Sequence, residues 1–239
     1  MQTGLYVALS SQMALERRLA TLADNVANAG TVGFRAGGVT FSDVMTGLSE
    51  ESVSFVSAGN NFYDTRAGGL QETGNPFDFA VQGDAWFAVE TPAGPMMTRD
   101  GRFTMRETGE LVTLEGHAVL DAGGAPLVLD PLAGPPEAGA DGMLLQNGQP
   151  VGAIGLFSFT PGPNATRYGN SGFLPGTQPQ PVVDQPDVGV AQGFLEDSNV
   201  NPVNEMMRLI QVQRTFEQVT ALMRDSDTSM EDAIKAMGS

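Results

Sequence analysis

The prolines of this 239-residue chain are confined to its middle. All 15 lie between Pro76 and Pro202, so the first 75 residues and the last 37 contain none. Proline is excluded from helix interiors because it lacks the backbone N–H and clashes with the preceding turn. The two ends of the chain can therefore form long helices, whereas turns interrupt the middle.

Apolar residues near the N-terminus recur at spacings of three and four, as on one face of a helix. This pattern predicts a helix that begins near Thr3 and fades near Asn28–Gly30, a length of roughly 25 residues. Its apolar seam has one polar interruption, at Gln12. The seam consists of Leu5, Ala8, Gln12, Leu15, Leu19, Leu22 and Val26.

The C-terminal segment repeats this spacing. Asn201 before Pro202 fits an N-cap followed by proline at the first helical position, and we expect a helix of about 35 residues. An apolar stripe on a helix needs a partner, and narrow stripes favour pairing of the two terminal helices as a coiled coil. The alternative is that each helix packs on the middle of the chain. The second seam consists of Leu209, Val212, Phe216, Val219, Met223, Ser226, Met230, Ala233 and Met237.

The middle of the chain alternates short apolar runs with Gly, Pro, Asn and Asp about every ten residues. This predicts a central antiparallel all-β domain over residues 76–190, built as a sheet, sandwich or open barrel. The expected fold class is therefore α+β, with helical segments at 1–35 and 191–239. We expect an extended, rod-type linker over 36–75, with a hairpin near Gly59–Asn60, and a long loop over 161–187.

Composition excludes several classes of protein. The formal net charge of −16 argues against nucleic acid or an anionic membrane as a partner, because both require a basic surface. With no Cys and one His, disulfides, thiolate zinc sites and sites with several histidines are excluded. The N-terminus has no basic stretch followed by an apolar run, so we expect no cleavable secretory signal and no membrane insertion. The chain is then cytoplasmic or leaves by a route that needs no such signal.

The residues that could carry chemistry have simpler structural interpretations. A lone histidine has no second ligand, an acidic cluster near the C-terminus lacks the glycine of a calcium loop, and any acidic β domain offers carboxylate pairs. An aromatic pair in an apolar run is typical of a core. We therefore expect no catalytic residue, no metal site and no cofactor. The residues considered are His117, Asp225–Asp227, Asp78, Asp84, Glu90, Asp100, Trp86 and Phe87.

Four segments form recognisable motifs. Residues 22–35 read LADNVANAGTVGFR, residues 79–87 read FAVQGDAWF, residues 98–103 read TRDGRF, and residues 192–203 read QGFLEDSNVNPV before the segment 207–216. In this order they resemble motifs of the flagellar rod, hook and hook-associated axial proteins, with Asp24 and Ala85 in place of the usual Asn and Gly. The resemblance covers about 1–35, 76–130 and 190–239. The motif positions are Asn25, Asn28, Thr31, Gly33, Phe34, Arg35, Ser198, Asn199 and Val200.

The resemblance implies a structural subunit of the bacterial flagellar basal-body rod, located in the periplasm. In this family the terminal helices line the inner tube of an axial filament as a coiled coil, with the β domain outside. The implied partners are copies of the chain, other rod proteins and the flagellar type III export apparatus. The implied assembly seam is Leu5, Leu15, Leu19, Leu22, Val26, Leu209, Val212, Phe216, Val219, Met223 and Met230.

Two questions stay open at this point. Chain length, the opening residues and the segment Asn201–Val203 favour a rod component near the junction of the proximal and distal rod, with a distal rod protein as the alternative. From other classes, an acidic β-domain cell-wall enzyme or an adhesin-like binding module also fits the composition.

We further expect the helical ends to order only on assembly. Gly33 is expected at positive φ, where Gly33→Val would block assembly but leave the β domain stable.

Overall fold

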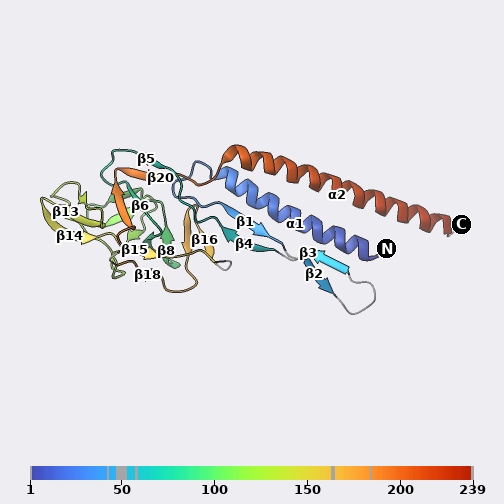
Figure 1. The fold of residues 1–239 in the computed structure, drawn as a ribbon, viewed down its shortest axis with the longest axis horizontal. Coiled ribbons are helices and arrows are strands. Elements are labelled where there is room, and N and C mark those ends of the chain that lie inside the picture. The colour runs from blue at the N-terminus through green and yellow to red at the C-terminus, as the bar shows by residue number, and fades with distance from the viewer. Residues whose placement is uncertain are drawn as a thin grey trace. The chain divides into compact units, whose positions relative to one another are not determined.

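The computed structural model describes residues 2–41, 43–46, 53–56, 59–162, 165–183 and 185–237. The fold is α+β, as expected, with a helix at each end of the chain and an antiparallel β region between them (Figure 1). The chain divides into two compact units. Unit 1 comprises Met1–Ala27, Gly37–Phe62 and Asn201–Ser239, and unit 2 comprises Asn28–Ala36 and Tyr63–Val200.

Unit 1 is built on the two predicted helices, α1 (Gln2–Ala27) and α2 (Pro202–Met237). They pack against each other, and because both chain ends lie at the same end of the pair they run antiparallel (Figure 1). The expected cap of α2 is confirmed, since the Asn201 side chain accepts a hydrogen bond from the Asn204 N–H at 3.0 Å and Pro202 opens the helix.

The described residues of unit 1 also form four strands in two ribbons: β1 pairs with β4, and β2 pairs antiparallel with β3. Strands β1 and β3 contact α1. The hairpin expected near Gly59–Asn60 is wrong, because β3 and β4 are not partners: β3 pairs with β2, and β4 pairs with β1. The bounds are β1 Gly37–Thr40, β2 Asp43–Thr46, β3 Val53–Val56 and β4 Asn60–Tyr63.

Unit 2 contains a nine-stranded sheet whose main path runs β16-β17-β8-β7-β11-β10-β9. One edge of β7 pairs with β8, and β11 and β15 share its other edge; β18 extends the sheet beyond β15. The strands are β7 Trp86–Thr91, β8 Gly94–Thr98, β9 Phe103–Met105, β10 Leu111–Thr113, β11 Ala118–Val119, β15 Leu156–Ser158, β16 Thr166–Tyr168, β17 Gly172–Leu174 and β18 Gln180–Pro181.

Three smaller antiparallel groups complete unit 2: β12-β13-β14, β19 with β6, and β20 with β5. The last two pairs join strands that lie more than 100 positions apart in the sequence. Their bounds are β5 Leu70–Glu72, β6 Phe79–Gln82, β12 Glu137–Ala138, β13 Met143–Gln146, β14 Gln149–Ala153, β19 Gly189–Gln192 and β20 Phe194–Glu196.

Side-chain alternation along β7 divides the core of unit 2 in two. Phe87 and Val89 enter the larger apolar cluster, whereas Trp86 and Ala88 enter a smaller one with Phe173. Alternate residues of a strand point to opposite faces, so the sheet is covered by apolar side chains on both sides. The prediction that Trp86 and Phe87 are core residues is confirmed.

The loop expected over 161–187 is wrong in part. Three short strands, β16, β17 and β18, lie within it and pair into the large sheet. Phe173 of β17 is fully buried and contacts the rings of Tyr63 and Trp86 edge to face. Strands of two or three residues among prolines leave too little periodicity to be recognised from sequence.

Candidate functional site

The described residues of the predicted helix seam are all buried or half-buried along α1 and α2. Leu22 and Val212 are the most enclosed, at 7 % and 6 % exposure. The side chains of Leu5 and Met230 lie outside the described residues. The other seam members are half-buried, namely Leu15, Leu19, Val26, Leu209, Phe216, Val219 and Met223.

Asn25 joins three parts of unit 1. Its amide nitrogen donates to the Gly37 carbonyl oxygen at 2.9 Å and to the Glu205 carboxylate at 3.2 Å, and its amide oxygen accepts from the Gly37 N–H at 2.9 Å. Arg208 then binds Glu205 through its guanidinium at 2.7 Å. Glu205 was missed from the sequence, where a glutamate in the first turn of a helix indicates only a favourable interaction with the helix dipole.

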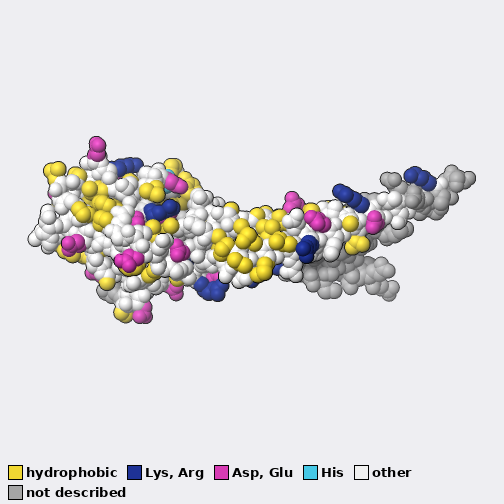
Figure 2. Space-filling view, turned by 90° about the horizontal axis from the view of Figure 1, so that it is seen from above, with side chains coloured by type: hydrophobic (Ala, Val, Ile, Leu, Met, Phe, Trp, Pro, Cys, Tyr) yellow, Lys and Arg dark blue, Asp and Glu magenta, His cyan; other side chains and the backbone are white. Residues whose placement is uncertain are grey.

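A second apolar stripe lies on the side of α2 away from its seam. Its members are between 46 % and 59 % exposed, and they follow the helical spacing of three and four. Figure 2 shows apolar side chains gathered over the N-terminal part of α2. On α1, Leu9 and Met13 are likewise exposed, at 45 % and 54 %. We call the α2 residues the outer stripe: Val203, Met206, Met207 and Ile210.

Gly33 packs against backbone in unit 2. Its φ is +68°, which confirms the expected positive value. A Cβ there would lie 2.5 Å from the carbonyl carbon of Arg99 and from the amide nitrogen of Asp100, so the position has no space for a side chain. The Gly33 N–H also donates to the Glu196 carbonyl oxygen at 2.7 Å. Gly33 therefore belongs to the packing of the β unit, and the expectation that Gly33→Val leaves this unit stable is wrong.

Arg35, the last residue of the first motif, is part of a buried charge cluster. Its Nη2 donates to Glu196 Oε1 at 2.6 Å, and Arg99 Nη1 donates to Glu196 Oε2 at 3.1 Å. The side chains of all three are at most 2 % exposed. Glu196 Oε1 also accepts from the Gly68 N–H at 2.9 Å. We call Arg35, Arg99 and Glu196 the buried charge cluster.

The buried charge cluster has two cations for one anion. Both guanidinium groups lie over the Trp86 ring, with the Arg35 and Arg99 Cζ atoms 5.5 Å and 5.3 Å from its centroid. Arg35 Nε, Arg35 Nη1 and Arg99 Nε are buried without a hydrogen-bond acceptor. Burial lowers the pKa of Arg99, and the Glu196 carboxylate opposes this shift. Glu196 and Arg99 lie in recognised motifs, but sequence alone did not indicate that they meet.

The remaining motif residues also make hydrogen bonds. Asn199 Oδ1 accepts from the Ala36 N–H at 2.7 Å, and Asn199 Nδ2 donates to the Asp64 and Arg66 carbonyl oxygens at 2.8 Å and 2.9 Å. Thr31 Oγ1 lies 3.1 Å from Asn28 Oδ1 and Ser198 Oγ accepts from the Val200 N–H. These side chains hold the segments that lead into and out of unit 2.

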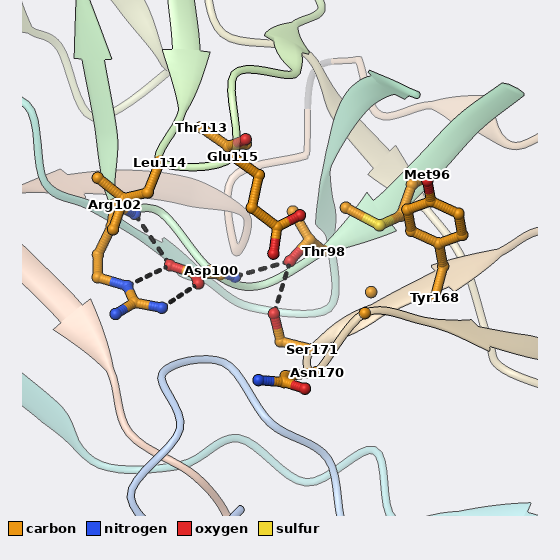
Figure 3. Close-up of a pocket in the computed structure, with 12 residues that line it drawn as sticks. Met96, Thr98, Asp100, Arg102, Thr113, Leu114, Glu115, Tyr168, Asn170 and Ser171 are labelled. Carbon is orange, nitrogen blue, oxygen red and sulfur yellow. Dashed lines mark hydrogen bonds and ion pairs between the residues drawn. The ribbon is translucent and has the colours of Figure 1, made fainter. Parts of the chain in front are cut away.

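Among the described residues, the side chains that could carry chemistry do not form a ligand or metal site. The pocket in Figure 3 has a volume of about 70 Å³, far below the several hundred Å³ of a typical ligand site. Four of its polar side chains bind one another in pairs, Asp100 with Arg102 at 2.6 Å and Thr98 with Ser171 at 3.4 Å. His117 lies 3.5 Å from the exposed Glu115 carboxylate. Over the part of the chain described, no group of His, Asp and Glu is arranged to hold a metal ion. Nor does any helix among those residues have the length and apolarity to span a bilayer.

Three family models match the chain in succession. Residues 5–35 match "Flagella basal body rod protein", residues 80–148 match "Flagellar hook protein FlgE/F/G D1 domain", and residues 191–236 match "Flagellar basal body rod FlgEFG protein C-terminal". The matched ranges contain the four motifs recognised in the sequence, except for Phe79 at the start of the second.

Whole-length relatives carry the same description. The flagellar basal-body rod protein FlgF of Mesorhizobium japonicum is 65% identical over 100% of this chain and 99% of its own, and FlgF of Rhizobium meliloti is 56% identical over the same shares. The flagellar basal-body rod protein FlgG of Bacillus subtilis is 27% identical over 98% of each chain.

Proposed function

The chain belongs to the flagellar basal-body rod protein family, and from that premise we propose how its two units serve the rod. It is a structural subunit of the basal-body rod, and it assembles with other rod components. In our proposal the assembly runs through the terminal helices. The α1–α2 seam forms a coiled coil in each subunit, and the outer stripe contacts neighbouring subunits.

The outer stripe is the observation that carries this proposal. A helix on the surface of a soluble protein normally has one apolar side, whereas the N-terminal part of α2 has two. Met206 and Ile210 of the outer stripe are 46 % and 49 % exposed, although both are large apolar side chains. Burial of such a surface by neighbouring copies in a head-to-tail arrangement gives an open-ended filament, as a rod requires.

Within the family, we propose the FlgF role, near the junction of the proximal and distal rod. The FlgF relatives support it, since they share 65% and 56% identity with the whole chain, against 27% for the FlgG relative. The distal rod role of FlgG is the second candidate. The four expected segments, 1–35, 36–75, 76–190 and 191–239, stay part of this proposal.

We also propose that the chain is exported through the flagellar type III apparatus, that it associates with its own copies, and that it has no enzymatic activity. The absence of activity agrees with the small pocket in Figure 3, where Thr98, Asp100, Arg102 and Ser171 are hydrogen-bonded among themselves.

The test is removal of the chain from its own cells. We expect cells without it to be non-motile, and their purified basal bodies to end at the proximal rod. When the chain is produced again in these cells, it should be recovered in basal bodies at a fixed ratio to other rod proteins. Cryo-electron microscopy of these particles separates the two candidate roles, because a FlgF role predicts a short layer at the junction and a FlgG role predicts the long distal segment.

Normal motility in the absence of the chain would contradict the proposal. Cell-wall hydrolysis by the purified chain, lost on substitution of Asp100, would favour the enzyme alternative instead.

A further inference from the structure

The segments that lead into and out of unit 2 bind each other rather than separate parts of the sheet. The incoming residues Gly33 to Ala36 contact the outgoing residues Glu196 to Asn199: Gly33 N–H donates to the Glu196 carbonyl, and Asn199 N–H donates to the Phe34 carbonyl at 3.3 Å. The outgoing strands β19 and β20 also provide the partners of β6 and β5. The last residues of unit 2, 189–200, therefore complete the strand pairing of this unit.

The buried charge cluster lies at this closure. Arg35 comes from the incoming segment, Arg99 from the loop after β8, and Glu196 from the end of β20. Without Glu196, two guanidinium groups would be buried beside the same Trp86 ring without the carboxylate that pairs with both of them. Removal of one partner from a buried ion pair is strongly destabilising, because the remaining charge is left without compensation in a medium of low polarity.

We infer that the buried charge cluster is a folding latch: it keeps unit 2 from folding until residues 189–200 and residues 33–36 are present together. A unit without residues 189–200 would have to bury Arg35 and Arg99 without the Glu196 carboxylate, and its β5 and β6 strands would lack the partners β20 and β19. The β unit therefore stays unfolded until both residues 33–36 and residues 189–200 are available to it. Its biological use rests on the proposed export, since a chain that moves through a narrow channel must not fold before it has passed.

The test uses the full-length chain and Glu196→Gln, which removes the charge and keeps the shape. Trp86 is the only tryptophan, so its fluorescence reports directly on the cluster. Amide hydrogen exchange reports on the rest of unit 2. We expect exchange at least about 100-fold faster across β6, β7 and β8, and a Trp86 emission shifted to the red. The matched control, Glu110→Gln, removes an exposed partner of Arg106 in the same unit and should behave as the wild type.

A charge-free variant separates charge from packing. Arg35→Met, Arg99→Met and Glu196→Gln together keep similar volumes and remove all three charges. The latch predicts that this triple variant recovers slow exchange in β6 to β8, although Glu196→Gln alone does not. The inference is overturned if Glu196→Gln loses protection only in β5 and β20, or if the triple variant is as unprotected as the single one. Neither readout depends on motility, so failure here leaves the rod assignment untouched.

Discussion

The side-chain amide of Asn25 donates a hydrogen bond to the Glu205 carboxylate at 3.2 Å, across 180 positions of sequence. It joins the last turns of α1 to the first turn of α2. Asn25 is 2 % exposed and also holds Gly37, where β1 begins. One motif residue therefore fixes both helices and the start of a β ribbon in unit 1.

Asn25→Ala removes three hydrogen bonds and leaves the buried Glu205 with Arg208 alone. We expect the free energy of unfolding of unit 1 to fall by about 2 kcal/mol. The observable results should be a lower amount of the chain in basal bodies and a smaller swarm. Asn25→Asp should lower this amount further, because its carboxylate would then lie against the Glu205 carboxylate. Adding Glu205→Gln to Asn25→Asp restores a donor and should recover part of the function. If the double variant is no better than Asn25→Asp, the contact is not what joins the helices.

A charge in the helix seam should be far more harmful than a charge reversal in unit 2. Leu22→Asp and Val212→Asp each bury a carboxylate among apolar side chains, which costs several kcal/mol. The comparison is Glu107→Lys, at an exposed turn, which should change stability by no more than about 0.5 kcal/mol. Equal swarming defects from Leu22→Asp and Glu107→Lys would count against the seam.

Substitution of Gly33 should unfold unit 2 rather than act on assembly alone. Gly33→Ala places a Cβ against the backbone of Arg99 and Asp100 and requires positive φ, so we expect about 3 kcal/mol of destabilisation in thermal unfolding of the β unit. Gly30→Ala is the matched control, since a Cβ there meets nothing within 4 Å. An unchanged melting temperature for Gly33→Ala would show that the close approach is not maintained in solution.

The outer stripe should matter only in the assembled rod. Ile210→Glu places a charge on a side chain that is already 49 % exposed, so the isolated chain should keep its helix content and its β-unit stability. We expect the variant to be exported but absent from purified basal bodies. Gln211→Glu, one position along and also exposed, is the control for added charge. Normal incorporation of Ile210→Glu would remove the stripe from the assembly surface.

The helices could be predicted from sequence because their signals are local. An uninterrupted apolar period and the pair Asn201–Pro202 define α2 within the sequence itself. The motif residues were identifiable for the same reason. Strands β1 to β4 were not, because two-stranded ribbons do not alternate clearly between a buried and an exposed side; β4, for instance, is mostly exposed.

The buried charge cluster was beyond sequence reasoning for a different physical reason. Arg35, Arg99 and Glu196 come from three distant segments, and charged residues are usually at the surface, so nothing local indicates that they are buried together. Glu205 was missed for the same reason, since its partner Asn25 lies at the other end of the chain. Long-range pairing of polar groups appears only in the folded structure.

The most direct test of rod assembly through the terminal helices is the amount of a truncated chain in purified basal bodies. Deletion of residues 220–239 removes the distal part of α2, with Met223 of the seam, and no strand. We predict a truncated chain whose β unit keeps the wild-type melting temperature but which is missing from basal bodies of non-motile cells. Recovery of the truncated chain in basal bodies at the wild-type ratio, in motile cells, would contradict the account.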